Sequence, residues 1–234
     1  MSQHPTPADF DSRAHARQMV LDAFRFRRAI KAFDPSRTIA PADVDYLLEA
    51  ARLSPTSHGL EPFRLLVIED RKVRLDLVER AGGVAAQMVD ASHLFALTAM
   101  TSAAVMPDSD FVRHMELDIK EMPPTAFAEW QVRFRGFLTS RYGVWGNDRA
   151  IFDWAGRQAY IVLGNIMTAA ALVGIDSCAL EGMVYSEADA VLTEAGAIDP
   201  DNERLAVMVA LGYRLEEPRR PMTRRSLGEM VQRI

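Results

Sequence analysis

Apolar residues recur at helical spacing in several stretches of the chain. Met19, Val20, Ala23 and Phe24 lie between charged positions at intervals compatible with one face of a helix, and Pro41 favours the start of another. The pattern predicts helices over residues 14–28, 41–53, 71–80 and 186–195, two more within 109–140 separated by Pro123-Pro124, and a long helix over 153–173.

Short apolar runs bounded by turn residues predict strands over residues 63–68, 94–98, 177–180 and 205–211, the first of them largely buried. Helices and strands are mixed along the chain without a repeat or a clear linker, which predicts one α+β domain over residues 1–234. Within it we expect a loose N-terminal arm (1–13), a helical excursion from the core (109–142) and an arginine-containing tail (214–234). The tail either lies in solvent or docks on another surface.

The helix expected over residues 153–173 is apolar nearly all round in its second half. Its apolar run is about as long as the shortest membrane span, but it contains Asn165 and ends in a turn-like sequence at Gly174. A helix of this kind needs cover on every side, so we expect it in the core or in a subunit interface.

Composition narrows the classes of function. The 234 residues are 49% hydrophobic, which is enough for a substantial core. The net charge of -5 provides no global positive field, so we expect neither nucleic acid nor a membrane as a partner. The N-terminus lacks the apolar stretch of a secretory signal, and the single Cys178 cannot form an internal disulfide. Both features fit a cytoplasmic protein.

Several common signatures of chemistry are missing. The chain has no Gly-x-Gly-x-x-Gly turn, no Walker loop and no Gly-x-Ser-x-Gly nucleophile elbow. His114, Glu116 and Asp118 are close in sequence, but on a helix His114 and Glu116 point in different directions. We therefore favour a solvated helix start, capped by Asp108 or Ser109, over a metal site, and we expect no metal.

Five separated segments carry the remaining candidate chemistry. They are Arg27-Arg-Ala-Ile-Lys-Ala-Phe-Asp34, the stretch from Ala50 to Phe63, Gln87-Met-Val-Asp-Ala-Ser-His93, Ser177-Cys-Ala-Leu-Glu-Gly-Met183 and Pro221-Met-Thr-Arg-Arg-Ser-Leu227. Each alone has an ordinary interpretation. In order, these are cations at a helix end, a turn, a polar residue on a short helix, a strand-end turn and a basic surface tail.

Together, the segments resemble the nitroreductase family, in particular its oxygen-insensitive, NAD(P)H-dependent branch, over most of the chain. The first is similar to the family's Arg-(Arg/His)-Ser-x-(Arg/Lys)-x-Phe-Asp signature, the second to a loop ending in (Gln/Glu)-Pro-(Trp/Phe), and the fourth to a strand and loop carrying Glu-Gly. The sequence departs from the family at Ala29, where serine is usual, at residues 84–86, which lack a common asparagine, and at Met222, where lysine is typical.

The resemblance implies which residues bind FMN. Arg27 would contact the phosphate or ribityl chain, and Lys31 would lie at the pyrimidine edge of the ring, where a cation stabilises the anion formed on reduction. The amides of Glu181 and Gly182 would face N5 and O4. The full expected set is Arg27, Arg28, Ala29, Lys31, Thr56, Ser57, Gly59, Gln87, Ala179, Leu180, Glu181, Gly182, Arg224 and Arg225, with Thr56, Ser57 and Gly59 supplied by the partner subunit.

The resemblance also implies a fold and a reaction. The fold would be a nitroreductase-like α+β arrangement of three layers, with a central, mostly antiparallel sheet flanked by helices, in a homodimer with exchanged tails. FMN would take a hydride from NAD(P)H and pass two electrons to a nitroaromatic or quinone in a ping-pong cycle, with the flavin N5 and no protein residue carrying the chemistry. Alternatives on the same scaffold are flavin or enal reduction, dehalogenation, and a binding or regulatory protein that has lost the cofactor.

Aromatic residues of the excursion are candidates for lining the acceptor channel, because flat electron-poor rings stack on aromatic surfaces. They are Phe111, Phe127, Trp130, Phe134 and Phe137. Helix packing accounts better for most of them.

Overall fold

Four strands form one antiparallel sheet in the computed structural model, which describes residues 10–82 and 85–234. They are β1 (Phe63–Val67), β2 (His93–Met100), β3 (Asp176–Leu180) and β4 (Glu203–Gly212), in the order β1-β2-β4-β3. All four predicted strands are therefore confirmed, most with ends shifted outward by one or two residues. Every pairing is antiparallel, as the expected sheet requires.

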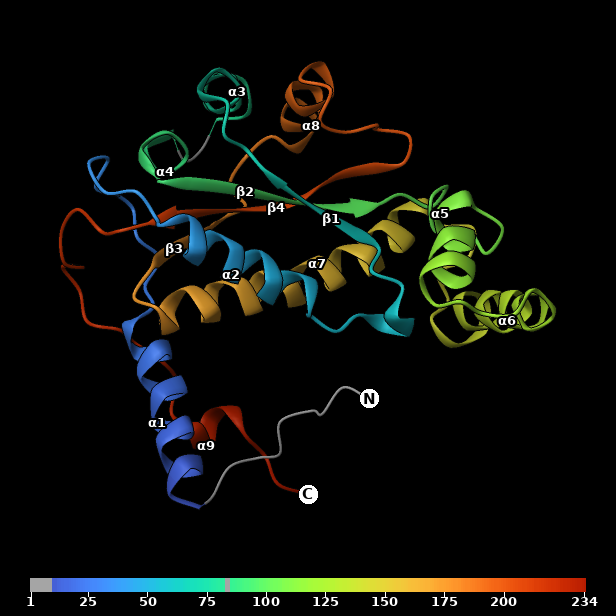
Figure 1. The fold of residues 1–234 in the computed structure, drawn as a ribbon, viewed down its shortest axis with the longest axis horizontal. Coiled ribbons are helices and arrows are strands. Elements are labelled where there is room, and N and C mark those ends of the chain that lie inside the picture. The colour runs from blue at the N-terminus through green and yellow to red at the C-terminus, as the bar shows by residue number, and fades with distance from the viewer. Residues whose placement is uncertain (1–9, 83–84) are drawn as a thin grey trace.

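Helices cover both faces of this sheet (Figure 1). The helices α3 (Arg71–Asp76), α4 (Ala85–Asp90) and α8 (Tyr185–Glu194) lie on one face, and α2 (Pro41–Arg52) and α7 (Asp148–Leu172) lie on the other. The result is the predicted three-layer α+β arrangement. The predicted helix over 71–80 is α3 followed by a π-helical turn, Leu77–Ala81.

The first helix, α1 (Phe10–Phe26), starts and ends earlier than the sequence pattern predicts. Residues 10–13 therefore belong to this helix, whereas residues 1–9 of the expected arm lie outside the described part of the chain. Arg27 and Arg28 follow the helix end instead of forming its last turn.

The long helix α7 begins five residues before the predicted start at Asp153, because Asn147 caps it. The Asn147 Oδ1 accepts the Ala150 N–H at 3.0 Å. One side of α7, including the fully buried Trp154, packs on the sheet and on α2, but Ile161 and Leu172 on another side are exposed. The chain alone therefore does not cover this helix on every side.

The strand β1 is an edge strand, so the prediction that it is largely buried is wrong. Most of its side chains are half-buried, whereas β2, in the middle of the sheet, has six buried residues in succession. An apolar run alone does not distinguish an edge strand from a central one, because only the neighbouring strands decide which it is.

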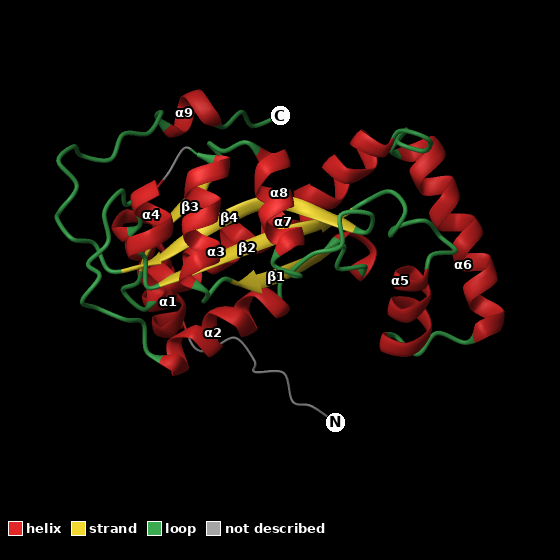
Figure 2. Ribbon diagram, turned by 90° about the horizontal axis from the view of Figure 1, so that it is seen from above, coloured by secondary structure: helices red, strands yellow, loops and turns green. Residues whose placement is uncertain are grey.

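The excursion stands at one end of the sheet (Figure 2). It consists of α5 (Asp110–Arg113) continued by a π-helical turn, His114–Ile119, and α6 (Pro124–Gly136) continued by another, Phe137–Arg141. The two helices predicted here are confirmed, and α6 begins at the proline pair as expected. Ser109 caps α5, since its Oγ accepts the Val112 N–H at 3.2 Å.

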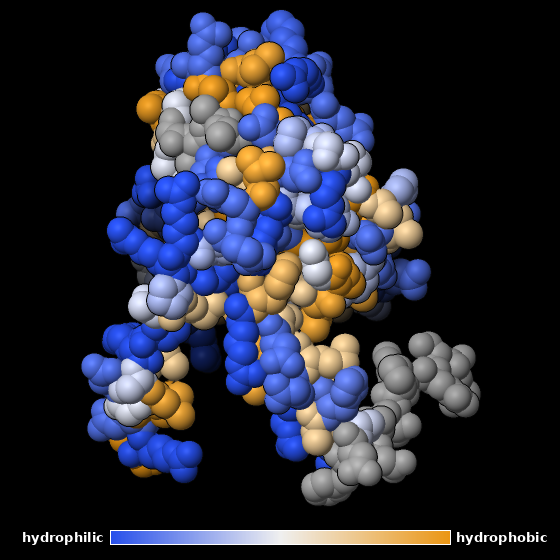
Figure 3. All heavy atoms as spheres, turned by 90° about the vertical axis from the view of Figure 1, so that its left-hand side faces the viewer, coloured by the Kyte–Doolittle hydropathy of each residue, from blue (hydrophilic) through white to orange (hydrophobic). Residues whose placement is uncertain are grey.

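The tail leaves the sheet after pairing with the segment that follows α1. Leu215 donates its backbone N–H to Ala32 O at 3.0 Å. Beyond it the chain is mostly exposed and ends near a short helix, α9 (Leu227–Met230), which the sequence pattern does not predict. Both α1 and the tail project from the body and carry hydrophobic residues on their surfaces (Figures 1 and 3).

Candidate functional site

The segment after α1 is held between the start of β3 and the end of β4. Ala29 forms a parallel bridge with Ser177, and Ile30 donates its backbone N–H to Ser177 O at 3.4 Å. Phe33, which is buried, forms an antiparallel bridge with Arg214. Pairing on both sides fixes the backbone that carries the first group of predicted cofactor residues.

A buried ion pair closes this junction. Asp176, the first residue of β3, accepts hydrogen bonds from the Arg214 backbone N–H at 2.9 Å and from its Nη2 at 2.7 Å. The same guanidinium donates to Phe26 O at 3.2 Å, at the end of α1. Its hydrogen bonds to Asp176 raise the pKa of Arg214. The pair therefore sets the position from which Arg27 enters the site.

Four predicted cofactor residues gather positive charge at the junction. Arg27 and Arg28 are half-buried, and burial lowers the pKa of Arg27, as does the nearby charge of Arg224. Lys31 Nζ lies 3.7 Å from Cys178 Sγ. Within residues 10–82 and 85–234, no carboxylate forms an ion pair with any of these four cations. Like charges gathered without a protein counterion suit an anionic ligand.

The tail is tied to the same junction. Arg28 Nη2 donates to Arg220 O at 2.5 Å, which holds the tail beside the segment after α1. Arg224 and Arg225 are both exposed beyond this contact. The structure thus brings Arg224 to Arg27, as expected, although the two residues are far apart in sequence.

The turn after β3 carries the predicted Glu181 and Gly182. Ala179, Glu181 and Gly182 are exposed, whereas the Leu180 side chain is buried in the core, so only its main chain is available to a ligand. The Glu181 carboxylate accepts a hydrogen bond from the hydroxyl of Tyr160 on α7. Sequence reasoning missed Tyr160, because its pairing with Glu181 links two elements without a recognisable local pattern.

Gln87 lies on α4, at the same end of the sheet as the junction (Figure 1). Only 7% of its surface is exposed. The side chains of residues 84–86, where the expected asparagine is missing, lie outside the described part of the chain.

The loop with Thr56, Ser57 and Gly59 lies at the other end of α2, away from the junction (Figure 1). Thr56 Oγ1 accepts the Glu61 N–H at 3.0 Å, and Ser57 donates its backbone N–H to Gln158 Oε1 on α7 at 2.9 Å. One chain therefore does not bring this loop together with Arg27. The expectation that the loop serves a site on a partner subunit stays a prediction.

Residues of the excursion contact this loop through a hydrogen bond and a ring contact. Lys120 Nζ donates to His58 O at 2.9 Å and forms an ion pair with Glu116, which is only 1% exposed. His58 adopts φ 59°, in the left-handed region, and its ring packs edge-on against Phe137 with centroids 4.3 Å apart. The helix start expected at Asp108 or Ser109 is confirmed by the cap at Ser109. Further along the same segment Glu116 is buried, whereas His114 is exposed and lies beside Asp118.

The aromatic side chains of the excursion pack mainly on one another. Phe127 and Phe134 are buried, and Trp130 stacks on Phe134 with centroids 4.8 Å apart. Phe111 and Phe137 pack partly buried against the same core. These contacts agree with helix packing as the role of most of them.

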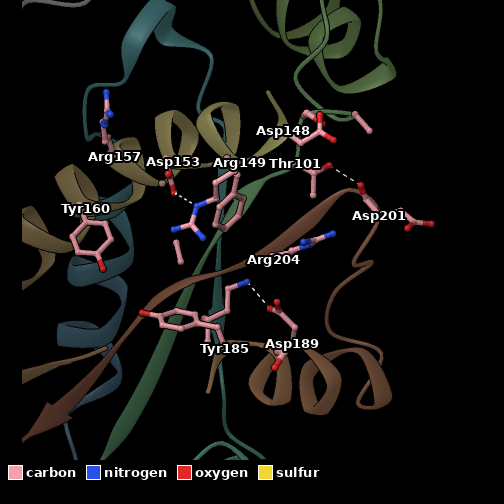
Figure 4. Close-up of a pocket in the computed structure, with 17 residues that line it drawn as sticks. Thr101, Asp148, Arg149, Asp153, Arg157, Tyr160, Tyr185, Asp189, Asp201 and Arg204 are labelled. Carbon is pink, nitrogen blue, oxygen red and sulfur yellow. Dashed lines mark hydrogen bonds and ion pairs between the residues drawn. The ribbon is translucent and has the colours of Figure 1, made fainter. Parts of the chain in front are cut away.

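A cavity of about 1010 Å³ lies between α7, the start of β4 and α8 (Figure 4). Charged residues such as Asp153, Arg157 and Arg204 line it beside apolar ones, and none of its lining residues belongs to the predicted cofactor set. Tyr160 and Tyr185 lie on its wall. The cavity therefore adjoins the Glu181 turn without containing the cation cluster.

Two features are absent from the described residues. No cluster of three or more metal-ligating side chains occurs among them. No helix among them has the length and apolar character that a membrane crossing requires.

The model of the nitroreductase family matches residues 24–213. The chain belongs to the nitroreductase family. Among similar proteins of this family, YfkO of Bacillus subtilis (strain 168), provisionally named an NAD(P)H nitroreductase, is 36% identical over 218 residues, which are 93% of this chain and 98% of YfkO. A protein of Staphylococcus aureus (strain USA300) with the same provisional name is 39% identical over 215 residues, which are 92% and 95% of the two chains.

The fold is also shared with solved nitroreductase structures. A provisionally named nitroreductase of Exiguobacterium sibiricum, solved in complex with FMN, superposes with a TM-score of 0.70 at 19% identity, covering 99% of this chain and 100% of that one. At this identity the likeness shows the fold alone. It confirms the predicted nitroreductase-like fold.

Proposed function

We propose that this chain is an FMN-dependent oxidoreductase that takes electrons from NAD(P)H and delivers them to a nitroaromatic or quinone. The observation that carries the proposal is the group of four cations at the junction of α1, β3 and the tail, which no carboxylate neutralises within the described residues. The similar proteins named NAD(P)H nitroreductases and the FMN in the Exiguobacterium structure support the choice of cofactor and donor.

The residues present fit this cofactor. Arg27 and Arg224 would hold the phosphate, because guanidinium groups bind phosphate oxygens with paired hydrogen bonds. Lys31 would place its ammonium near the pyrimidine edge, and the amides of the Glu181–Gly182 turn would face the reactive edge of the ring. When bound, FMN would supply hydride acceptance and two-electron transfer, and the protein would position and tune it.

A second copy of the chain would complete the site. The Thr56–Gly59 loop and the cation cluster lie at opposite ends of α2, so one copy supplies only part of the expected set. Exposed apolar residues on α7 and α1, such as Ile161 and Phe24, would be covered in a homodimer with exchanged tails.

The cofactor is tested by absorption spectroscopy and anaerobic titration. The purified protein should show flavin absorption bands after loading with FMN, and NADH or NADPH should bleach them. Arg27→Gln should raise the Kd for FMN about ten- to hundredfold, the effect of losing a hydrogen bond to a charged group. Arg133→Gln, an exposed arginine on α6, serves as the control and should bind FMN like the wild type. A wild-type protein that takes up no FMN would refute the proposal.

The dimer is tested by sedimentation. Ile161→Arg should weaken self-association because it places a charge on the exposed apolar side of α7, and it should weaken FMN binding at the same time. Val132→Arg, at an exposed site on α6, should change neither property. A monomeric Ile161→Arg protein that binds FMN as tightly as the wild type would exclude a site shared between two copies.

A further inference from the structure

Two tyrosines from different elements lie near the carboxylate of Glu181. Tyr160 projects from α7 and donates its hydroxyl hydrogen to Glu181 Oε1, and Tyr185 stands at the start of α8. Figure 4 shows the two hydroxyl groups pointing toward one another across the end of the cavity. One phenol therefore donates to the exposed Glu181 carboxylate, and the other lies close enough for the charge of that carboxylate to raise its pKa.

Both phenol groups stay protonated over the physiological pH range. Burial raises the pKa of Tyr160, and its hydrogen bond to Glu181 raises it further. Burial also raises the pKa of Tyr185, together with the negative charge of Glu181. A phenol that remains protonated is a permanent donor, so Tyr160 can donate to the carboxylate throughout this pH range.

The residues before and after Glu181 are anchored in the fold. Leu180, the last residue of β3, is buried, and Met183 donates its backbone N–H to Glu181 O at 2.9 Å. Val184 donates its backbone N–H to Ala81 O at 2.9 Å, which fixes the entry into α8. Because the residues on both sides are fixed, the contacts of the Glu181 side chain are what remains to set the orientation of the Glu181–Gly182 amides.

We propose that Tyr160 is a positioning residue, which acts through the Glu181 carboxylate to hold the Glu181–Gly182 amides in the orientation that the flavin requires. The hydroxyl comes from α7, the helix that also binds the Thr56–Gly59 loop through Gln158. One helix thus contacts both the Glu181–Gly182 turn and the loop that the proposed function assigns to the partner's site. This inference rests on the proposed function.

The experiment is a double-substitution cycle with a readout on the bound flavin itself. Tyr160→Phe keeps the ring and removes only the hydroxyl, and Glu181→Ala removes the acceptor. Each variant is loaded with FMN, and we measure the reduction potential and the visible spectrum of the bound flavin, followed by the single-turnover rate of its reduction by NAD(P)H. Tyr46→Phe is the matched control, because Tyr46 on α2 and Tyr160 are each 40% exposed.

We expect Tyr160→Phe to shift the potential and spectrum of the bound flavin and to slow its reduction about tenfold, the size of one hydrogen bond to a charged group. If the tyrosine acts through Glu181, the double variant should be no worse than Glu181→Ala alone, because the two changes break the same interaction. Tyr46→Phe should match the wild type in all three measurements.

Three outcomes would overturn the inference. Additive effects of the two substitutions would show that Tyr160 acts independently of Glu181. A Tyr160→Phe protein with the wild-type potential, spectrum and reduction rate would show that the hydroxyl does not orient the turn, while leaving the proposed function intact. If Tyr160→Phe does not fold, Glu181→Gln, which keeps a neutral acceptor, should shift the potential less than Glu181→Ala, and an equal shift would exclude the mechanism. A wild-type protein without FMN affinity would instead refute the proposed function.

Discussion

The ion pair at the junction predicts a large loss of stability in Asp176→Asn. The Asp176 side chain is 3% exposed and that of Arg214 is 15% exposed. The carboxylate accepts from both the backbone and the side chain of Arg214. Removing one partner of a buried pair leaves an uncompensated charge and typically costs about 3–5 kcal/mol. Because asparagine keeps the shape and one acceptor oxygen, we expect a loss near the lower end, about 3 kcal/mol, measured as a lower urea midpoint with an unchanged slope.

The same arginine provides the control. Its Nη1 also donates to Glu217 at 2.8 Å, but the Glu217 side chain is 84% exposed, so Glu217→Gln should leave the urea midpoint close to that of the wild type. Asp176→Asn should in addition weaken FMN binding, because the Arg214 guanidinium holds the end of α1 from which Arg27 follows. If the two variants lost the same stability, the reasoning from burial would be refuted.

Three further substitutions test other features of the fold. In Gly212→Ala, the new Cβ would lie 2.9 Å from Cδ1 of Phe33, so we expect overpacking to remove about 1–3 kcal/mol, and an unchanged urea midpoint would contradict this. Arg74→Met should cost about 3 kcal/mol in the same assay, because the buried guanidinium donates to three backbone carbonyls that would lose their partner, and a stability equal to the wild type would exclude that role. Burial lowers the pKa of His93, so on acidification the unfolded state takes up the proton first, and stability falls as the pH drops through the unfolded-state pKa toward the lower folded-state value. His93→Gln should therefore lose less stability than the wild type between about pH 7 and pH 5, and an equal benefit from His114→Gln, at an exposed ring, would contradict the assignment.

Much of the fold could be predicted from the sequence, because each strand is a short apolar run and each main helix carries a periodic apolar face. The position of each strand in the sheet could not be predicted, since no local pattern marks β1 as an edge. The sequence pattern places the start of α7 too late, because the cap at Asn147 precedes several polar residues that weaken the apolar period. The helix α9 consists of four residues, fewer than a periodic pattern needs.

The candidate site, like the fold, contains residues that the sequence predicts and residues that it does not. Arg27, Lys31 and Arg224 were expected from the family resemblance, and the structure brings them to one junction. The sequence does not predict the roles of Tyr160 and Lys120, because each contacts a residue of a different element and neither belongs to a motif. Contacts of this kind are set by how helices pack against loops, which is a property of the folded chain.

The placement of the cations explains why the site should depend on its ligand. The end of α1 and the tail meet at the junction, and both also project from the body and bury little surface of their own. Burial lowers the pKa of Arg27 and the charge of Arg224 lowers it further, so the protein alone places two like charges together at the expense of stability. An anionic phosphate bound between the two arginines would attract both of them and so offset their mutual repulsion. Under the proposed function, FMN would therefore contribute to the docking of the tail as well as to the chemistry, because a ligand that binds only the folded arrangement stabilises it.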